Sequence, residues 1–230
     1  MKIRDCEYPD ELLYAVEDGI WARESDGEFV IGAAPTLGWI SGGFMSVTLK
    51  PVGTKVARGK VMGSIEGPRH FDVLRAPFDC TVVGRNGAVL DNPRLANKSP
   101  YDEGWLVELK QSGKETSLVP LVEGVTEIRA RLVELRVHCF AAFPDVEMYE
   151  IGVECAAVLS KLSELIDVSP PETTVHVVSD DPTAAIEMER WQMRTGNSLL
   201  ETKRDGTLYH FIVKKREGMK NSASFGHQDG

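Results

Sequence analysis

Apolar and polar residues alternate over short distances in the first half of the chain, which is typical of strands. Residues 20–33 predict two strands joined at Asp26-Gly27, a pair that tolerates positive φ angles. Glycine and proline interrupt the pattern between residues 44 and 90, where Asn86-Gly87 predicts a further tight turn. Many short strands with frequent turns favour a small all-β barrel or sandwich.

The spacing becomes helical after Pro120. Apolar residues then recur at steps of three and four, which predicts an amphipathic helix whose apolar face holds Val125, Ile128, Leu132, Leu135 and Cys139. Pro144 interrupts this pattern, and we place a domain boundary there. The first domain is therefore expected to comprise residues 1–143.

Residues 144–215 predict the element order β-α-β-α-β-β. Asp181-Pro182 is typical of a helix start, and a hairpin is expected around Asp205-Gly206. Two helices on one face of a four-stranded sheet would form a two-layer α/β sandwich. The remaining residues, 216–230, are polar and small and are expected to be disordered.

Composition narrows the classes of function. The chain has 230 residues, is 42% hydrophobic and 27% charged, and carries a formal net charge of −9, which disfavours nucleic acid or an anionic membrane as a partner. The N-terminal residues lack the apolar segment of a signal peptide, so a cytoplasmic location is expected. The cysteines are widely spaced, so we expect neither a metal site nor disulfides among Cys6, Cys80, Cys139 and Cys155.

Two segments of the first half resemble the glycine cleavage H protein. "PVGTKVARGKVMGSIE" (51–66) is similar to a stretch shared by lipoyl and biotinyl domains, and "LDNPRLANKSPYDEGWLVEL" (90–109) is similar to the signature of the H protein itself. The resemblance covers about residues 8–140 and implies a lipoyl-type barrel-sandwich hybrid with flanking helices. It also implies a carrier whose lipoyl group is joined to a lysine at a hairpin tip.

This chain departs from the family at that lysine. Counting through residues 66–77 without a gap places Arg69 at the modified position, and no lysine lies between Lys60 and Lys98. A guanidinium stays protonated and is a poor acyl acceptor, so lipoate is not expected as a cofactor. One interpretation is that the first domain is a former carrier that is kept for scaffolding or docking. Another is that its hairpin tip has been remodelled and binds a partner through Arg69 and His70. Lipoylation elsewhere, for example at Lys98, is the third alternative.

Residues 151–215 resemble the TusA family of sulfur carriers. The likeness lies in Gly152-x-x-Cys155, in "DDP" (180–182) and in the closing hairpin "LLETKRDGTLYHFIVKK". It implies that Cys155 carries a persulfide. Where the family has Cys-Pro, this chain has Cys155-Ala156, so the cysteine is held less rigidly.

Elementary chemistry gives Cys155 two interpretations. Unpaired backbone N–H groups and the helix dipole at a helix start favour thiolate, the nucleophilic form, although Glu154 opposes it slightly. Alternatively, Cys155 is only a small, half-buried residue at the beginning of a helix. The other residues are weaker candidates for a functional role. We expect Cys139 and Trp191 in the core and a structural role for His176. Cys6 could be reactive but has no base beside it, and Asp180 and Asp181 are not expected to form an acid–base pair.

Together these features predict a sulfur-relay protein, more a carrier than a stand-alone enzyme. Cys155 would hold the persulfide, and the H-protein-like domain would dock through Arg69 and His70. The implied partners are sulfur-donor and sulfur-acceptor proteins and heterodisulfide-reductase-like or glycine-cleavage-type enzymes. The alternatives are a non-catalytic adaptor and a glycine cleavage H protein.

Overall fold

The computed structural model describes residues 1–217. The chain forms two compact units, the first from Met1 to Phe143 and the second from Pro144 onward. Each unit is described by itself. Of the tail that is expected to be disordered, residues 218–230 lie outside the described residues.

The strands of the first unit are short, as the frequent turn residues require. They are β1 (Lys2–Ile3), β2 (Cys6–Glu7), β3 (Leu13–Ala15), β4 (Ile20–Ser25), β5 (Glu28–Ala33), β6 (Ser46–Leu49), β7 (Lys55–Val56), β8 (Val61–Glu66), β9 (Phe71–Arg75), β10 (Phe78–Arg85), β11 (Val107–Thr116) and β12 (Val119–Pro120). The helices between them are α1 (Pro35–Ser41), α2 (Gly87–Asp91), α3 (Leu95–Lys98) and α4 (Leu121–Glu134).

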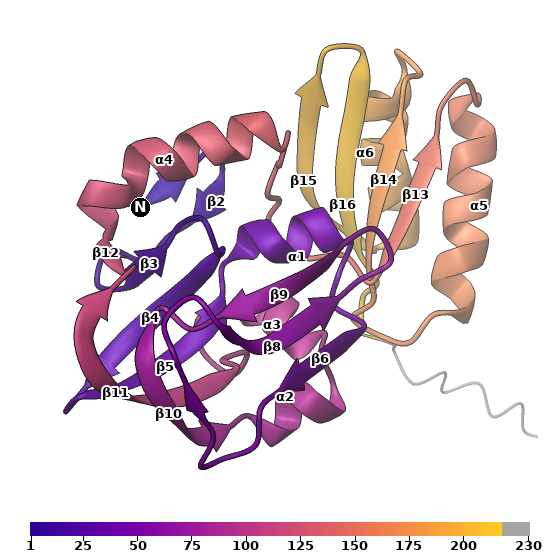
Figure 1. Ribbon diagram of the computed structural model, residues 1–230. Coiled ribbons are helices and arrows are strands. Elements are labelled where there is room, and N and C mark those ends of the chain that lie inside the picture. Colours follow the sequence, from indigo (N-terminus) through magenta and orange to yellow (C-terminus); the bar gives the residue numbers. More distant parts are fainter. Residues whose placement is uncertain (218–230) are drawn as a thin grey trace, which may run out of the picture. The chain divides into compact units, whose positions relative to one another are not determined.

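Besides the two-stranded ribbon of β1 and β2, the first unit contains two larger sheets. The larger has the order β12-β3-β4-β5-β11-β10-β7, and the smaller has the order β6-β8-β9 (Figure 1). The hairpin predicted at Asp26-Gly27 is confirmed, since β4 and β5 pair in antiparallel register around these two residues. The turn predicted at Asn86-Gly87 is wrong, because the Asn86 side chain accepts a hydrogen bond from the Val89 N–H and begins α2.

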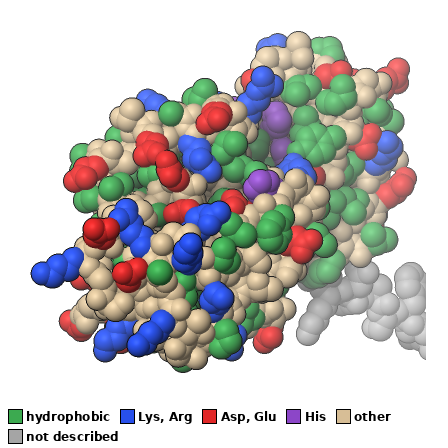
Figure 2. Space-filling model, in the orientation of Figure 1, with side chains coloured by type: hydrophobic (Ala, Val, Ile, Leu, Met, Phe, Trp, Pro, Cys, Tyr) green, Lys and Arg blue, Asp and Glu red, His purple; other side chains and the backbone are tan. Residues whose placement is uncertain are grey.

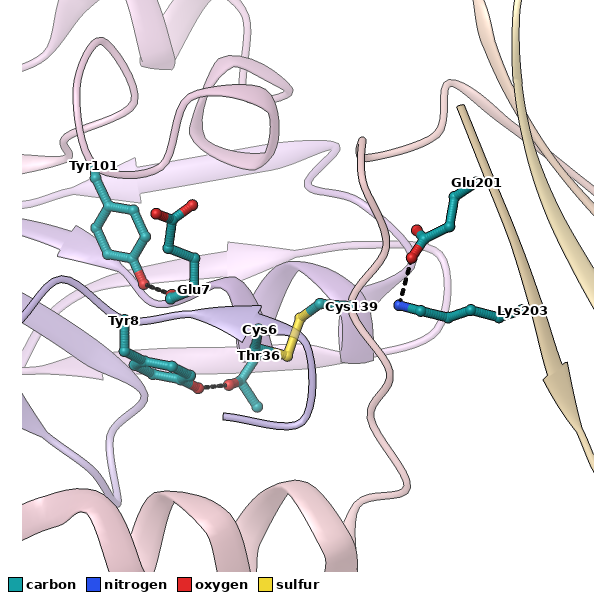
Figure 3. The surroundings of a disulfide bond; sticks show 8 residues. All are labelled: Cys6, Glu7, Tyr8, Thr36, Tyr101, Cys139, Glu201 and Lys203. Carbon is teal, nitrogen blue, oxygen red and sulfur yellow. Dashed lines mark hydrogen bonds and ion pairs between the residues drawn. A yellow bond between two sulfur atoms is a disulfide. The ribbon is translucent and has the colours of Figure 1, made fainter. Parts of the chain in front are cut away.

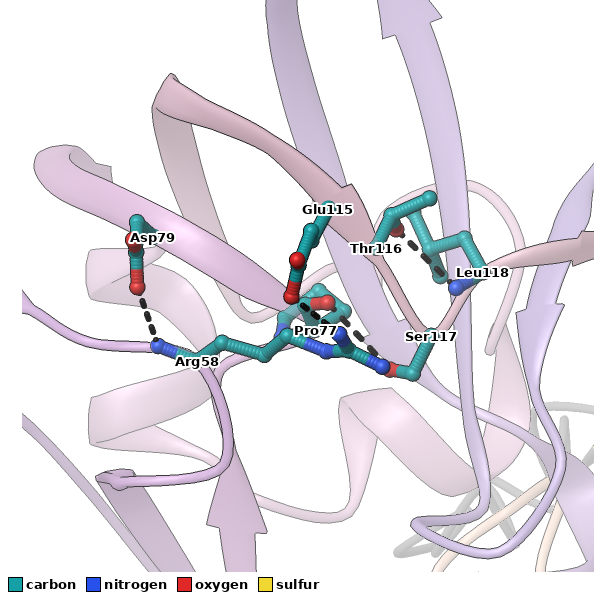
Figure 4. Close-up of polar contacts among 7 residues, drawn as sticks. All are labelled: Arg58, Pro77, Asp79, Glu115, Thr116, Ser117 and Leu118. Carbon is teal, nitrogen blue, oxygen red and sulfur yellow. Dashed lines mark hydrogen bonds and ion pairs between the residues drawn. The ribbon is translucent and has the colours of Figure 1, made fainter.

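The main core of the first unit consists of buried apolar side chains from both of these sheets. Phe29 and Phe78 pack with ring centroids 4.7 Å apart, and Phe78 is fully buried. Burying such a ring contributes about 1.5–3 kcal/mol. On the surface, the guanidinium of Arg58 pairs with Glu115, and the backbone N–H of Arg58 donates to Asp79 (Figure 4). These exposed contacts contribute much less than the core.

The helix predicted to reach Cys139 ends earlier, at Glu134. Arg136 adopts a left-handed conformation with φ of 51°, and the N–H of Val137 then donates to the carbonyl of Leu132. This is the hydrogen bonding of a Schellman motif, which usually has glycine at the left-handed position. Because an arginine occupies that position, the sequence shows no stop signal, and the predicted boundary was too late.

The second unit has its elements in the order that the sequence predicts. They are β13 (Val146–Glu150), α5 (Cys155–Val168), β14 (Thr174–Ser179), α6 (Ala184–Thr195), β15 (Ser198–Asp205) and β16 (Leu208–Lys214). The sheet has the order β13-β14-β16-β15, with β13 and β14 parallel. Apolar side chains of α5, α6 and the strands share one core, in which Trp191 is fully buried, as predicted.

The start of α6 differs from its prediction. The helix begins at Ala184, after Thr183, so Pro182 lies before it and not in its first turn. The Asp181 carboxylate accepts hydrogen bonds from the backbone N–H of Thr183 at 2.7 Å and from its hydroxyl at 2.6 Å. Asp181 therefore holds the turn before the helix and not the helix end itself.

Candidate functional site

The first candidate site is the tip of the hairpin formed by β8 and β9. The two strands pair from Val61 to Glu66 and from Phe71 to Arg75. The tip is closed by a hydrogen bond of 2.9 Å from the N–H of Gly67 to the carbonyl of His70. This geometry leaves Pro68, Arg69 and His70 exposed between the strands.

Arg69 is held against the end of α1. One guanidinium nitrogen donates to the backbone carbonyl of Trp39 at 2.9 Å, and the Arg69 N–H donates to the carbonyl of Ser41 at 3.1 Å. The approach requires glycine at Gly42, which has φ of 71° and where an added Cβ would lie 2.7 Å from Nε of Arg69. The tip residue is therefore anchored to backbone and not extended on a free arm.

His70 follows Arg69 and faces an acidic neighbour. Its Nε2 lies 3.6 Å from a carboxylate oxygen of Asp72, and both side chains are partly exposed. An ion pair of this kind would form only when the imidazole is protonated and would contribute little to stability. The tip thus combines a guanidinium with an imidazole, and neither group is an acyl acceptor of the amine type.

The second candidate site is Cys155, the first residue of α5. Its side chain is 5% exposed and packs in the core of the second unit. Its backbone N–H donates to a carboxylate oxygen of Asp181 at 2.9 Å. A carboxylate from another segment thus occupies the position at the helix start where a thiolate was expected to gain stabilisation.

The expected lowering of the Cys155 pKa is wrong. Burial raises the pKa of this thiol to about 11, and the negative charges of Asp181 and Glu187 add to the effect. The hydrogen bonds from Thr183 and Cys155 in turn lower the pKa of Asp181. At neutral pH Cys155 is therefore a protonated thiol, and the neighbouring carboxylate stays charged.

Asp180 and Asp181 accept hydrogen bonds from different parts of the chain. Asp180 accepts a hydrogen bond of 2.8 Å from the N–H of Gly152, and Asp181 accepts hydrogen bonds from the N–H groups of Cys155 and Thr183. The two carboxylates therefore fix the loop between β13 and α5 to the end of β14. Sequence spacing alone could not show that residues 26 and 28 positions apart share these contacts.

The expectation that the chain has no disulfide is wrong. Cys6 and Cys139 form a disulfide bond with Cα atoms 4.9 Å apart, although 133 positions separate them in the sequence (Figure 3). Cys139 is buried, as predicted, but it lies beyond the end of α4 and not on its apolar face. Near it, Tyr8 and Thr36 share a hydrogen bond, and the Tyr101 hydroxyl donates to the carbonyl of Glu7 (Figure 3).

His176 lies in β14 and contacts a residue that the sequence analysis did not single out. Its Nε2 lies 3.0 Å from Nδ1 of His210 on β16, and its Nδ1 lies 3.7 Å from a carboxylate oxygen of Glu147. Sheet pairing brings the three strands together, and only a correct register could have revealed this contact. Within residues 1–217, no three or more His, Cys, Asp or Glu side chains, these included, are arranged so that they could hold a metal ion.

The first unit therefore defines a lipoyl-type β protein with a tip hairpin and flanking helices. The family model of the glycine cleavage H-protein matches residues 12–130. A glycine cleavage system H protein 5 of Aquifex aeolicus is 32% identical over 126 residues, which cover 53% of this chain and 85% of that protein. The glycine cleavage system H protein of Listeria monocytogenes serotype 4a is 36% identical over 103 residues, covering 45% and 82%.

The chain belongs to the glycine cleavage H-protein family. A crystal structure of an H protein from Mycobacterium marinum is also similar, with 25% identity and a TM-score of 0.48 over 52% of this chain and 98% of that one. The family match ends before the second unit, so the resemblance to TusA stays a prediction. None of the helices in residues 1–217 is long and apolar enough to cross a membrane, and the location stays a prediction.

Proposed function

We propose that the H-protein unit of this chain is a docking module, which binds enzymes that recognise H proteins and carries no lipoyl group. The observation that carries the proposal is the tip of the β8–β9 hairpin. The family resemblance implies a lipoyl lysine there, whereas Arg69 stands in its place and is bonded to the carbonyl of Trp39. Acylation of a guanidinium is unfavourable, and an anchored side chain cannot serve as a swinging arm.

The surface around the tip has the composition of a protein interface. Phe71 is 58% exposed and Met45 is 66% exposed, both at ends of the β6-β8-β9 sheet. Figure 2 shows Lys and Arg side chains on the face of the molecule that carries β8 and β9. Exposed aromatic, methionine and arginine groups are enriched where proteins bind one another.

Lipoylation is tested first, by co-expressing the chain with a lipoate ligase and measuring the intact mass. A lipoylated H protein expressed in the same cells is the positive control. We expect the control to gain the mass of a lipoyl group and this chain to gain none. A lipoyl adduct on any residue of the chain, Lys98 included, would overturn this part of the proposal.

Docking is tested by competition. The purified chain is added to a reconstituted glycine-cleavage reaction that depends on a lipoylated H protein, and we expect it to lower the rate. Arg69→Glu should remove the inhibition because it reverses the charge at the tip. Arg129→Glu, an exposed charge reversal on α4, is the matched control and should inhibit like the unaltered chain. Absence of inhibition, or equal loss in both variants, contradicts docking through the tip.

Sulfur relay through Cys155 is the second proposed function. It is favoured by the place of Cys155 just beyond the carboxyl end of β13, beside the end of the parallel strand β14, an edge where α/β sheets commonly bind ligands. It is opposed by the raised pKa and by burial of the thiol. The relay would therefore need a donor protein that exposes Cys155 on binding.

Intact-mass measurement after incubation with a donor protein that carries a cysteine persulfide tests the relay. The terminal sulfane sulfur of the donor persulfide would pass to the Cys155 sulfur, which becomes a persulfide while the donor is left as a thiol. We expect a gain of one sulfur atom that Cys155→Ser abolishes and Cys80→Ser leaves in place. A chain that gains no sulfur, or a gain that survives Cys155→Ser, removes the relay.

A further inference from the structure

A pocket of about 240 Å³ lies in the first unit. Its lining residues come from α1, from α3, from the ribbon of β1 and β2, and from residues 139–143. Cys139 of the disulfide lines the pocket, as do Glu7 and Tyr101; Figure 3 shows these side chains. Pockets for drug-sized molecules measure about 300–1,000 Å³, so a smaller ligand fits here.

Asn97 of α3 supplies the polar feature of the pocket. Its side chain is 9% exposed, and its Oδ1 accepts a hydrogen bond of 2.7 Å from the N–H of Phe44. That bond fixes the orientation of the amide, so Nδ2 is the donor end. Among residues 1–217 no protein atom accepts a hydrogen bond from Nδ2. A buried donor of this kind costs about 1–3 kcal/mol unless a partner satisfies it.

The surroundings of Nδ2 place it directly behind the pocket wall. An added Cβ on Gly38 would lie 2.5 Å from Nδ2 and 3.5 Å from the ring of Phe143, and both residues line the pocket. Phe143 is half-buried at the end of the first unit and packs on Trp39 with ring centroids 4.6 Å apart. Asn97 itself is also one of the residues that line the pocket.

The charged lining selects the kind of anion. Lys2 and Lys98 bring two ammonium groups, which favour an anionic acceptor. Asp5 and Glu7 bring two carboxylates, which oppose a second negative charge on the ligand. A singly charged group is therefore favoured over a phosphate ester.

We propose that this pocket binds a small monocarboxylate with an apolar body. One carboxylate oxygen would accept the hydrogen bond from Nδ2 of Asn97, and the apolar body would lie against Trp39 and Phe140, whose ring centroids are 5.4 Å apart. Trp39 lines the pocket and its carbonyl accepts the hydrogen bond from Arg69, but neither Arg69 nor His70 lines the pocket, so the two proposals are tested on different side chains and either can fail alone.

Three probes of similar shape test the proposal on the ¹⁵N-labelled full chain: benzoate, benzyl alcohol and phenyl phosphate. We expect benzoate to shift the Asn97 side-chain amide resonances saturably, and the other two to bind at least about tenfold more weakly. Equal binding of benzyl alcohol, preference for phenyl phosphate, or benzoate shifts confined to other residues would overturn the proposal. So would a lack of saturation.

Two variants locate the contact. Asn97→Asp keeps the shape and the acceptor but replaces the donor with a carboxylate, and we expect at least about a tenfold loss of benzoate affinity. If that variant does not fold, Lys98→Gln gives the answer: benzoate should bind a few-fold more weakly, about two- to fivefold, and benzyl alcohol unchanged. Lys110→Gln, exposed on β11, is the control and should change neither. Unaltered benzoate binding in Lys98→Gln overturns the site.

Discussion

The hairpin tip and the start of α5 are the two positions where a family resemblance implies chemistry, and their surroundings are opposite. Arg69 is exposed and bonded to backbone at its guanidinium, whereas Cys155 is buried and has a carboxylate at its own N–H. At the tip the residue type rules out the implied chemistry although the site is open. At the helix start the residue type is right, and burial together with negative charge suppresses it.

A residue can therefore occupy the position of a family motif without having the reactivity that the motif implies. A helix start stabilises a thiolate only when its N–H groups face the sulfur and no other anion has taken them. Here Asp181 has taken the N–H of Cys155. Both the burial of Cys155 and the charge beside it can be changed by substitution.

Replacing Trp191 should have the largest effect. Trp191→Ala removes a fully buried ring and its hydrogen bond of 2.9 Å to Ser163, and we expect a loss of about 3–5 kcal/mol in the unfolding free energy of the second unit. Because Trp191 shares a core with Cys155, the thiol should also become open to iodoacetamide. Urea unfolding and alkylation rates measure both effects.

Met193→Ala is the matched control for this prediction. Met193 lies on the same helix with 76% of its side chain exposed, and its loss should change stability by less than about 0.5 kcal/mol. A folded Trp191→Ala chain whose Cys155 is still unreactive would show that something other than core packing protects the thiol.

Opening the disulfide should have the next largest effect, and only on the first unit. Cys6→Ser with Cys139→Ser removes a link that spans 133 positions, and we expect a loss of about 2–4 kcal/mol. Reductant should lower the stability of the unaltered chain by a similar amount and should not affect the double variant. Reductant sensitivity in the double variant would contradict this account.

Alkaline pH should weaken the second unit through Cys155. The folded pKa of about 11 lies above the ordinary value of 9.0, so the folded state keeps a proton that the unfolded state loses. The contribution is complete below about pH 9 and is lost as pH rises through 11, with a size of about 2–3 kcal/mol. Cys155→Ser should remove this dependence, as followed by urea unfolding at pH 8 to 11.

Cys80 provides the internal comparison for this pH dependence. Burial also raises its pKa to about 11, with a further contribution from Asp79, but it lies in the first unit. Cys80→Ser should therefore change the alkaline unfolding of the first unit and leave that of the second. The same response in both units would mean that these thiols are not its source.

Removing the charge of Asp181 should have the smallest effect. Asp181→Asn takes away the larger of the two coulombic contributions to the Cys155 pKa while burial remains, so the pKa should fall part of the way towards 9.0. We expect alkylation at neutral pH to rise by about two- to fivefold. Peptide mapping distinguishes Cys155 from Cys80. An unchanged rate would leave burial as the whole cause.

Local signals predicted much of the fold. Asp26-Gly27 and Asp205-Gly206 gave two hairpins correctly, because the residues that make the turn are adjacent in sequence. The apolar spacing from Cys155 likewise predicted α5, since a helix repeats every few residues. Arg136 marks where this fails: an arginine in the left-handed conformation carries no stop signal.

The candidate sites were predicted less completely, for a different physical reason. The gap-free count identified Arg69 at the tip, but its bond to Trp39 depends on packing across 30 positions. The pairing of Cys6 with Cys139 and the contact of Asp181 with Cys155 also join distant segments. Periodicity holds no information on such contacts, and these are the contacts that set the environment of a reactive group.

The bond between Cys6 and Cys139 also determines how the first unit responds to mechanical tension. Nearly all of that unit lies inside the covalent ring that the two sulfur atoms close. A force applied at the N-terminus and at residue 144 would run through the sulfur bridge and bypass the enclosed sheets. The unit would lengthen only by its few outer residues, which include β1, and the strands of its two larger sheets would stay paired until a reductant cut the bridge.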